Sequence, residues 1–166
     1  MANGLSGLGL TPVLVGGMAL VILGSQRVTR DFDFVIAAPG DRLQDVIDVL
    51  YTRGLELVSR LNEDGEVVST IANRRIATVR VRLDAPSSVY FCNPKTGLRI
   101  DLLFDFPIAA SELAEGATNT KVQSQNLRVA SERDLLRLKR IAAAGRSSPG
   151  DAQDIAFLEA RVKRPG

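Results

Sequence analysis

The chain begins with short apolar runs that alternate with stretches in which apolar residues recur at helical spacing. Residues 13–15 form a β-branched apolar run that ends at a Gly-Gly pair, and residues 31–37 (DFDFVIA) alternate strictly between polar and apolar. These two patterns predict strands. Residues 18–23 and 41–53 carry the spacing of helices, and Gly54 closes the second. The predicted order is therefore strand, helix, strand, helix.

The middle and the end of the chain extend this pattern to a mixed sheet and a helical pair. Further strands are predicted at residues 75–84 (RIATVRVRLD), 90–92 and 98–106 (LRIDLLFDF). Their hairpin-like spacing favours a mixed sheet. Residues 131–164 predict two amphipathic helices broken at residues 145–150 (GRSSPG). The predicted fold class is α+β, a mixed β-sheet flanked by helices, with two C-terminal helices.

Length and composition predict one folded unit and exclude several kinds of chemistry. The 166 residues match a single domain, 1–166, with a core at 11–108 and a C-terminal helical part at 130–164. A content of 45% hydrophobic and 24% charged residues is that of a globular protein. The chain has no histidine, which excludes Ser-His-Asp and Cys-His catalysis and His-ligated zinc. A net charge of +2 indicates no strong general attraction to nucleic acid or anionic membrane.

Cysteine usage and hydropathy bear on the compartment. Cys92 is the one cysteine and lies in an apolar stretch, so we expect a buried packing thiol and a reducing, cytoplasmic setting. The apolar run at residues 13–24 is too short to span a bilayer, and no Lys or Arg precedes it. We therefore expect neither a membrane segment nor a signal peptide.

Two aspartates lie on the same side of the strand at residues 31–37. Successive side chains of a strand point to opposite faces, so Asp31 and Asp33 project together while Phe32 and Phe34 enter the core. Like charges this close raise each other's pKa unless a cation lies between them, and a divalent metal is the simplest such cation. The alternative is the solvated face of an antiparallel sheet.

The strand at residues 98–106 repeats the arrangement. Asp101 and Asp105 fall on one face, and apolar residues fill the other. If the two strands are neighbours, Asp101 completes a three-carboxylate cluster able to hold Mg²⁺, which prefers a few hard oxygen ligands plus substrate phosphates. Asp105 is the alternative third ligand.

Two other features are candidate phosphate contacts. Gly16 and Gly17 lie between strand and helix, where a ligand can approach the backbone and a helix N-terminus offers free N–H groups, although a plain tight turn is the alternative. Arg80 and Arg82 share a predicted strand face with Thr78 and could meet phosphate or RNA. For these arginines a solvated face is the favoured interpretation.

These motifs together resemble the nucleotidyltransferase superfamily with the DNA polymerase beta-like core, in particular its minimal AbiEii/MenT-type toxins. The resemblance lies in Gly-Gly-Met-Ala at residues 16–19, Arg-Val-Thr-Arg-Asp-Phe-Asp at 27–33, Arg-Ile-Asp-Leu-Leu at 99–103, and ASERDLLRLKRIAAAGR at 130–146. It covers most of the chain, from residue 13 to residue 158.

The resemblance implies a set of site residues. The catalytic and metal-binding residues it implies are Asp31, Asp33 and Asp101, with Mg²⁺ as cofactor. The nucleotide-binding residues it implies are Gly16, Gly17, Arg27, Thr29, Lys139 and Asp154.

Lys139 and the two aspartates that follow it admit more than one role. On a helical wheel Lys139 falls within the apolar arc, so it either snorkels or faces the acids. Asp154 could orient Lys139, or Asp151 could cap the last helix, and the cap is the favoured interpretation for Asp151. The connection RSSPGD before Asp154 is longer than the resembling family usually has.

The function implied is Mg²⁺-dependent transfer of a nucleoside monophosphate from an NTP, such as ATP, to a hydroxyl acceptor. The acceptor stays open between a tRNA 3′ end, a protein and a small molecule of the aminoglycoside type. A toxin of a toxin–antitoxin system would have an antitoxin partner, and a homodimer is compatible with the resemblance. The alternative from a different class is a non-catalytic nucleotide-binding or interaction module with the same fold.

Overall fold

The computed structural model describes residues 1–146 and 148–164 and is built around one mixed sheet. The strand order is β4-β3-β5-β6-β2-β1-β8-β7. The strands are β1 (Val13–Val15), β2 (Asp31–Ile36), β3 (Glu56–Leu61), β4 (Val67–Ile71), β5 (Ser88–Cys92), β6 (Arg99–Phe104), β7 (Thr118–Val122) and β8 (Gln125–Val129). Parallel and antiparallel pairs both occur in it. The predicted α+β class with a mixed sheet is confirmed.

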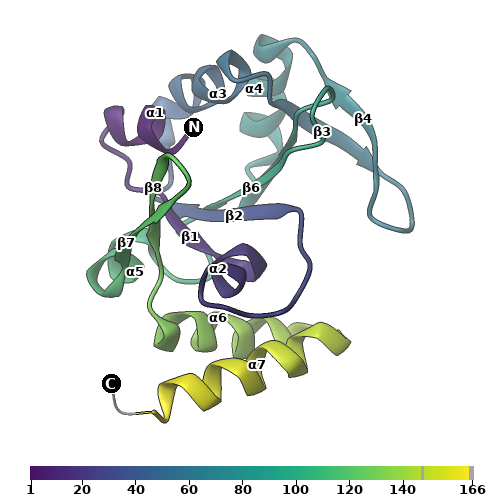
Figure 1. The fold of residues 1–166 in the computed structure, drawn as a ribbon. Coiled ribbons are helices and arrows are strands. Elements are labelled where there is room, and N and C mark those ends of the chain that lie inside the picture. Colours follow the sequence, from purple (N-terminus) through teal and green to yellow (C-terminus); the bar gives the residue numbers. More distant parts are fainter. Residues whose placement is uncertain (147, 165–166) are drawn as a thin grey trace.

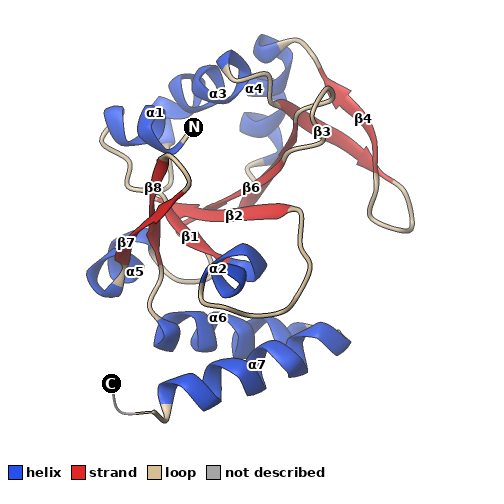
Figure 2. Ribbon diagram, in the orientation of Figure 1, coloured by secondary structure: helices blue, strands red, loops and turns tan. Residues whose placement is uncertain are grey.

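Helices cover both faces of this sheet (Figure 1). In the view of Figure 2, α1, α3 and α4 lie above the strands, whereas α2, α6 and α7 lie below them. The helices are α1 (Ala2–Gly7), α2 (Gly16–Ile22), α3 (Leu43–Thr52), α4 (Arg74–Asp84), α5 (Ala110–Gly116), α6 (Glu132–Gly145) and α7 (Pro149–Val162), and a 3₁₀ turn, η1 (Gly40–Arg42), precedes α3.

The central strands are the ones that the alternating pattern predicts. Strand β2 lies between β1, to which it is antiparallel, and β6, to which it is parallel. Phe34, Ile100 and Leu102 are buried, as expected for the apolar faces of β2 and β6. Cys92 is buried as well, which confirms the packing thiol.

The segment at residues 75–84 is helix α4, so the predicted strand was wrong. The side chain of Asn73 accepts hydrogen bonds from the N–H groups of Arg75 and Ile76, at 3.0 and 3.2 Å, and so caps the helix start. Thr78, expected to share an exposed strand face with Arg80 and Arg82, is buried and donates to the Arg74 carbonyl at 2.9 Å. The apparent alternation arises because α4 carries apolar residues on two sides.

Several short elements were not anticipated from the sequence. They are helices α1 and α5 and the two hairpins β3–β4 and β7–β8. Both hairpins form the outer ends of the sheet, and most of their residues are at least partly exposed. Strands β3, β4 and β7 carry little apolar periodicity, because few of their side chains on either face are buried.

The two C-terminal helices are confirmed as α6 and α7. Ser131 caps α6 by accepting a hydrogen bond from the Asp134 N–H at 3.1 Å. Ser147, within the predicted break, lies outside the described residues. Among the described residues, none of the helices is both long and apolar enough to cross a bilayer.

Candidate active site

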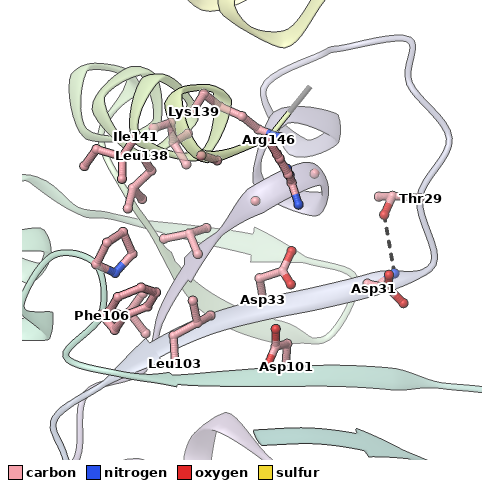
Figure 3. Close-up of a pocket in the computed structure, with 18 of the residues that line it drawn as sticks. Thr29, Asp31, Asp33, Asp101, Leu103, Phe106, Leu138, Lys139, Ile141 and Arg146 are labelled. Carbon is pink, nitrogen blue, oxygen red and sulfur yellow. Dashed lines mark hydrogen bonds between the residues drawn. The ribbon is translucent and has the colours of Figure 1, made fainter. Parts of the chain in front are cut away.

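Strands β2 and β6 bring the three predicted acids to one place. Asp33 of β2 lies directly beside Asp101 of β6 in the parallel register, and Asp31 lies two residues earlier on β2. Figure 3 shows the Asp33 and Asp101 side chains rising from the two strands into the same space, with Asp31 further along β2. The adjacency on which the sequence-based cluster depended is therefore present.

The electrostatics of this cluster are those of an incomplete site. Burial, and after it the charge of Asp31, raises the pKa of Asp33 to about 6. Burial, and after it the charges of Asp33 and Asp31, raises the pKa of Asp101 to about 7. In addition, Oδ1 of Asp101 is buried and accepts no hydrogen bond from the described residues. Burial and mutual repulsion thus outweigh the nearby charges of Lys139, Arg27 and Arg146, which lower the pKa of Asp33.

The donor set suits a hard divalent cation that keeps part of its hydration. Among the described residues, no group of three or more acidic or thiol side chains is placed so that it could hold a metal ion by itself. Mg²⁺ does not need such a group, because it is usually bound by one or two carboxylates plus waters and substrate phosphates. An orphaned buried carboxylate oxygen beside two further carboxylates fits such an ion.

Gly16 is required by the close approach of Asp33. Its φ is +68°, and a Cβ added there would lie 2.8 Å from Cγ of Asp33. Gly17 is less constrained, because a Cβ there would meet only the end of the Arg27 side chain. Any side chain at position 16 would therefore displace the Asp33 carboxylate.

Two hydroxyl groups support Asp31. The Tyr90 hydroxyl donates to Oδ1 of Asp31 at 3.1 Å from the neighbouring strand β5. Burial and the nearby Asp31 raise the pKa of Tyr90 to about 12, so it stays a donor. Thr29 accepts a hydrogen bond from the Asp31 N–H at 3.4 Å, drawn in Figure 3. Tyr90 was missed in the sequence, since only the strand register shows that it lies beside Asp101.

A network of paired charges lies across the cavity from the acids. Nζ of Lys139 is 2.6 Å from Oδ2 of Asp154, and the guanidinium of Arg27 pairs with the same carboxylate. Lys139 is 9% exposed and Asp154 is 4% exposed. Lys139 is therefore buried and does not snorkel, and its ammonium pairs with Asp154 and not with the three acids.

Asp151 belongs to this network rather than to a helix cap, so the favoured interpretation of Asp151 was wrong. Helix α7 begins at Pro149 after Ser148, and Asp151 lies in its first turn. Its carboxylate accepts from Nε of Arg146 at 3.1 Å and lies 3.4 Å from Nζ of Lys139. The hydrogen bond from Arg146 is the main cause of the lowered pKa of Asp151. The buried Asp151 side chain points into the protein, where Arg146 and Lys139 compensate its charge.

Acids and cations line one cavity of about 550 Å³, a size typical of ligand sites. Its remaining wall is apolar and was not anticipated: it includes Leu103, Phe106, Leu138 and Ile141. Phe106 and Ile141 are about half exposed, although both are large apolar side chains. Arg146 also lines the cavity, and its only signal in the sequence was its position at the end of the motif at residues 130–146.

Asp105 is not part of this site. Its carboxylate accepts hydrogen bonds from the N–H groups of Ala38 and Ala110, at 2.9 and 2.8 Å. Its backbone has a φ of +49° after the end of β6, so it leaves the strand face that carries Asp101. Asp105 is therefore excluded as the alternative third ligand. Its hydrogen bonds instead link the loop after β2 to the start of α5.

The family of the chain follows from comparison with known proteins. The family model for the nucleotidyl transferase AbiEii toxin of type IV toxin–antitoxin systems matches residues 2–163. The chain belongs to the AbiEii nucleotidyltransferase family. A comparison with curated protein sequences found no significant match. The resemblance drawn from the motifs is confirmed over almost the whole chain.

Solved nucleotidyltransferase structures share the fold. An antigenic nucleotidyltransferase-like protein from Paracoccidioides brasiliensis is 18% identical, with a TM-score of 0.62 over 99% of this chain and 74% of that one. The lincosamide antibiotic adenylyltransferase LnuA, lincomycin-bound, is 16% identical, with a TM-score of 0.57 over 95% and 90%. A nucleotidyltransferase from Thermotoga maritima is 11% identical, with a TM-score of 0.50 over 87% and 83%.

Membership of the AbiEii family makes the chain a transferase enzyme whose reaction class is nucleotidyl transfer. Family membership also associates it with toxin–antitoxin systems.

Proposed function

We propose that this AbiEii-family enzyme transfers a nucleoside monophosphate from an NTP to a hydroxyl group of RNA, using Mg²⁺ held by Asp31, Asp33 and Asp101. The observation that carries the proposal is the pairing of Asp33 with Asp101 across parallel strands, with one buried oxygen of Asp101 unpartnered. A purely structural role would give the buried Oδ1 of Asp101 a hydrogen-bond donor, and it has none among the described residues.

In this proposal the residues of the chain bind and orient the two reactants. Arg27, Lys139 and Arg146 balance the charge of the triphosphate, and the backbone at Gly16 and Gly17 gives it room. When bound, Mg²⁺ supplies Lewis-acid polarisation of the phosphate. Asp101 accepts the proton of the acceptor hydroxyl, a bond forms between that oxygen and the α-phosphorus, and pyrophosphate leaves.

RNA is the acceptor class that the surroundings favour. A second depression of about 350 Å³ is lined by Arg30 and Arg99. Arg30 precedes Asp31 in the chain, and Arg99 lies beside Asp31 in the β2–β6 register. Arg99 is ion-paired with Glu66, so Arg30, which is exposed and makes no ion pair among the described residues, is the cation that suits a phosphate backbone leading into the site. The 3′ end of tRNA is the acceptor of this class to test first.

The experiment incubates the protein with each of the four α-³²P-labelled NTPs and total RNA, cell protein or an aminoglycoside. We expect label in RNA that depends on Mg²⁺ and is removed by ribonuclease. Asp33→Asn should reduce the transfer at least about 10³-fold, because it removes charge stabilisation worth several kcal/mol. Label in protein or antibiotic alone would refute the RNA acceptor, and transfer by the Asn variant at the wild-type rate would refute the site.

A further inference from the structure

Helix α4 carries apolar side chains on two opposite sides. Ala77, Thr78 and Val81 are buried against the body of the protein. Ile76, Val79 and Leu83, spaced by three and four residues, form the outer stripe and are 58%, 55% and 78% exposed. At about 100° per residue the two sets point in nearly opposite directions.

The outer stripe is unusual for a solvent-facing surface. Single exposed apolar residues are ordinary, whereas a contiguous row at helical spacing marks an interaction site. A surface helix that only covers its own core carries a single apolar stripe. Packing within this chain therefore does not account for the second apolar stripe of α4.

The charges that flank the stripe decide what kind of partner suits it. Arg75 and Arg82 lie seven residues apart along one side of the stripe. Neither makes an ion pair within the described part of the chain. Arg80 borders the other side and pairs with Asp84 at 2.7 Å. The border with Arg75 and Arg82 is thus basic and uncompensated, whereas the border with Arg80 and Asp84 is neutral.

A second copy of the chain does not satisfy these charges. If two α4 helices paired antiparallel, the border with Arg75 and Arg82 would face its own copy, and the like charges would be destabilising. If they paired parallel, that border would face the internally paired Arg80 and Asp84, which offer no net negative charge. An acidic partner instead gains both apolar burial and charge complementarity.

We propose that the outer stripe of α4 is a docking surface for an acidic amphipathic helix of a different protein. Such a helix lays its own apolar face on Ile76, Val79 and Leu83 and directs glutamates or aspartates to Arg75 and Arg82. Helix α4 lies on the layer opposite to α6 and α7, so the partner leaves the catalytic cavity open (Figure 1). The inference does not depend on the proposed acceptor.

The test uses two synthetic helical peptides with the same leucine stripe, one with glutamate borders and one with lysine borders. We expect the full-length protein to bind the glutamate peptide and not the lysine peptide in fluorescence anisotropy. Val79→Ser should weaken that binding at least about tenfold. Val28→Ser, which also changes an exposed valine, lies in a loop outside α4 and should leave the binding unchanged.

A second experiment reverses the charges of the arginines beside the stripe. The double variant Arg75→Glu, Arg82→Glu should exchange the preference, so that the lysine peptide binds and the glutamate peptide does not. Equal binding of both peptides, no binding of either, or insensitivity to Val79→Ser would overturn the proposal. A dimer in analytical ultracentrifugation that Val79→Ser dissociates would overturn it in favour of a second copy. Transfer activity of the variants, measured separately, should equal that of the wild type.

Discussion

Two groups of charged residues face each other across the cavity, and they differ in how completely their charges are compensated. Asp31, Asp33 and Asp101 repel one another, and the buried Oδ1 of Asp101 has no partner. Across from them, Asp154 compensates both Arg27 and Lys139. Figure 3 shows Lys139 and Arg146 above Asp33 and Asp101. In the paired group the charges compensate one another within the chain, whereas in the acidic group the carboxylates repel one another.

The largest expected effect on stability comes from breaking the paired group. Asp154→Ala leaves Arg27 and Lys139 without their common counter-charge, and removing one partner of a buried pair costs about 3–5 kcal/mol. In a chain of this length that corresponds to a loss of about 10 °C in Tm. Thermal unfolding followed by circular dichroism measures it.

The matched control is Glu159→Ala, which breaks another ion pair between α6 and α7. The Arg140–Glu159 pair is exposed, so we expect Tm to stay almost unchanged. If Asp154→Ala were as harmless as Glu159→Ala, the paired group would not be the stabilising one.

The next largest effect is expected on transfer activity, from a change at Gly16, where the glycine turn meets Asp33. Gly16→Ala introduces a Cβ against Asp33 and requires an L-residue at a φ of +68°, which costs about 1–3 kcal/mol. Gly24→Ala, with a φ of +97° and open space around it, imposes only the backbone cost. We expect transfer activity to fall more than about tenfold in the first variant only. Equal activity in the two would show that the Asp33 position is not critical.

A smaller effect of opposite sign is expected in the acidic group. In the metal-free protein the folded state raises the pKa of Asp101 to about 7, so it holds a proton that the unfolded chain loses near pH 4. The free energy of unfolding therefore falls as the pH rises between these two values. Asp101→Asn removes this penalty and should raise Tm at pH 7.5 by about 3 °C or more, with no gain near pH 4. A destabilised Asn variant at pH 7.5 would contradict the account.

The smallest effect is expected from Tyr90→Phe. This change removes one hydrogen bond to Asp31 while keeping the ring, and such a bond is worth about 1 kcal/mol. We expect a decrease in kcat/KM of about fivefold and a decrease in Tm of only about 2–4 °C. A complete loss of activity would give the Tyr90 hydroxyl a part in the chemistry.

The sequence predicted the parts of the molecule in which one physical signal dominates. Strict alternation identified β2, and the glycine pair and the acids together predicted a candidate site whose residues the fold brings to one cavity. Helix α4 was misjudged because its two apolar sides mimic a strand, and the edge hairpins have too little apolar contrast. Two parts of the site were missed. Tyr90 reaches it through the register between neighbouring strands and Phe106 through the path of a loop, and neither can be predicted from a local sequence pattern.

The most direct test of the central claim is the binding of Mn²⁺, as a paramagnetic substitute for Mg²⁺, in the presence of a non-hydrolysable NTP analogue. Electron paramagnetic resonance would follow free Mn²⁺ with the wild type and with Asp33→Asn. We predict that the wild type binds the ion and that the variant binds it at least about tenfold more weakly. Equal binding by the two proteins would contradict a metal site formed by these acids.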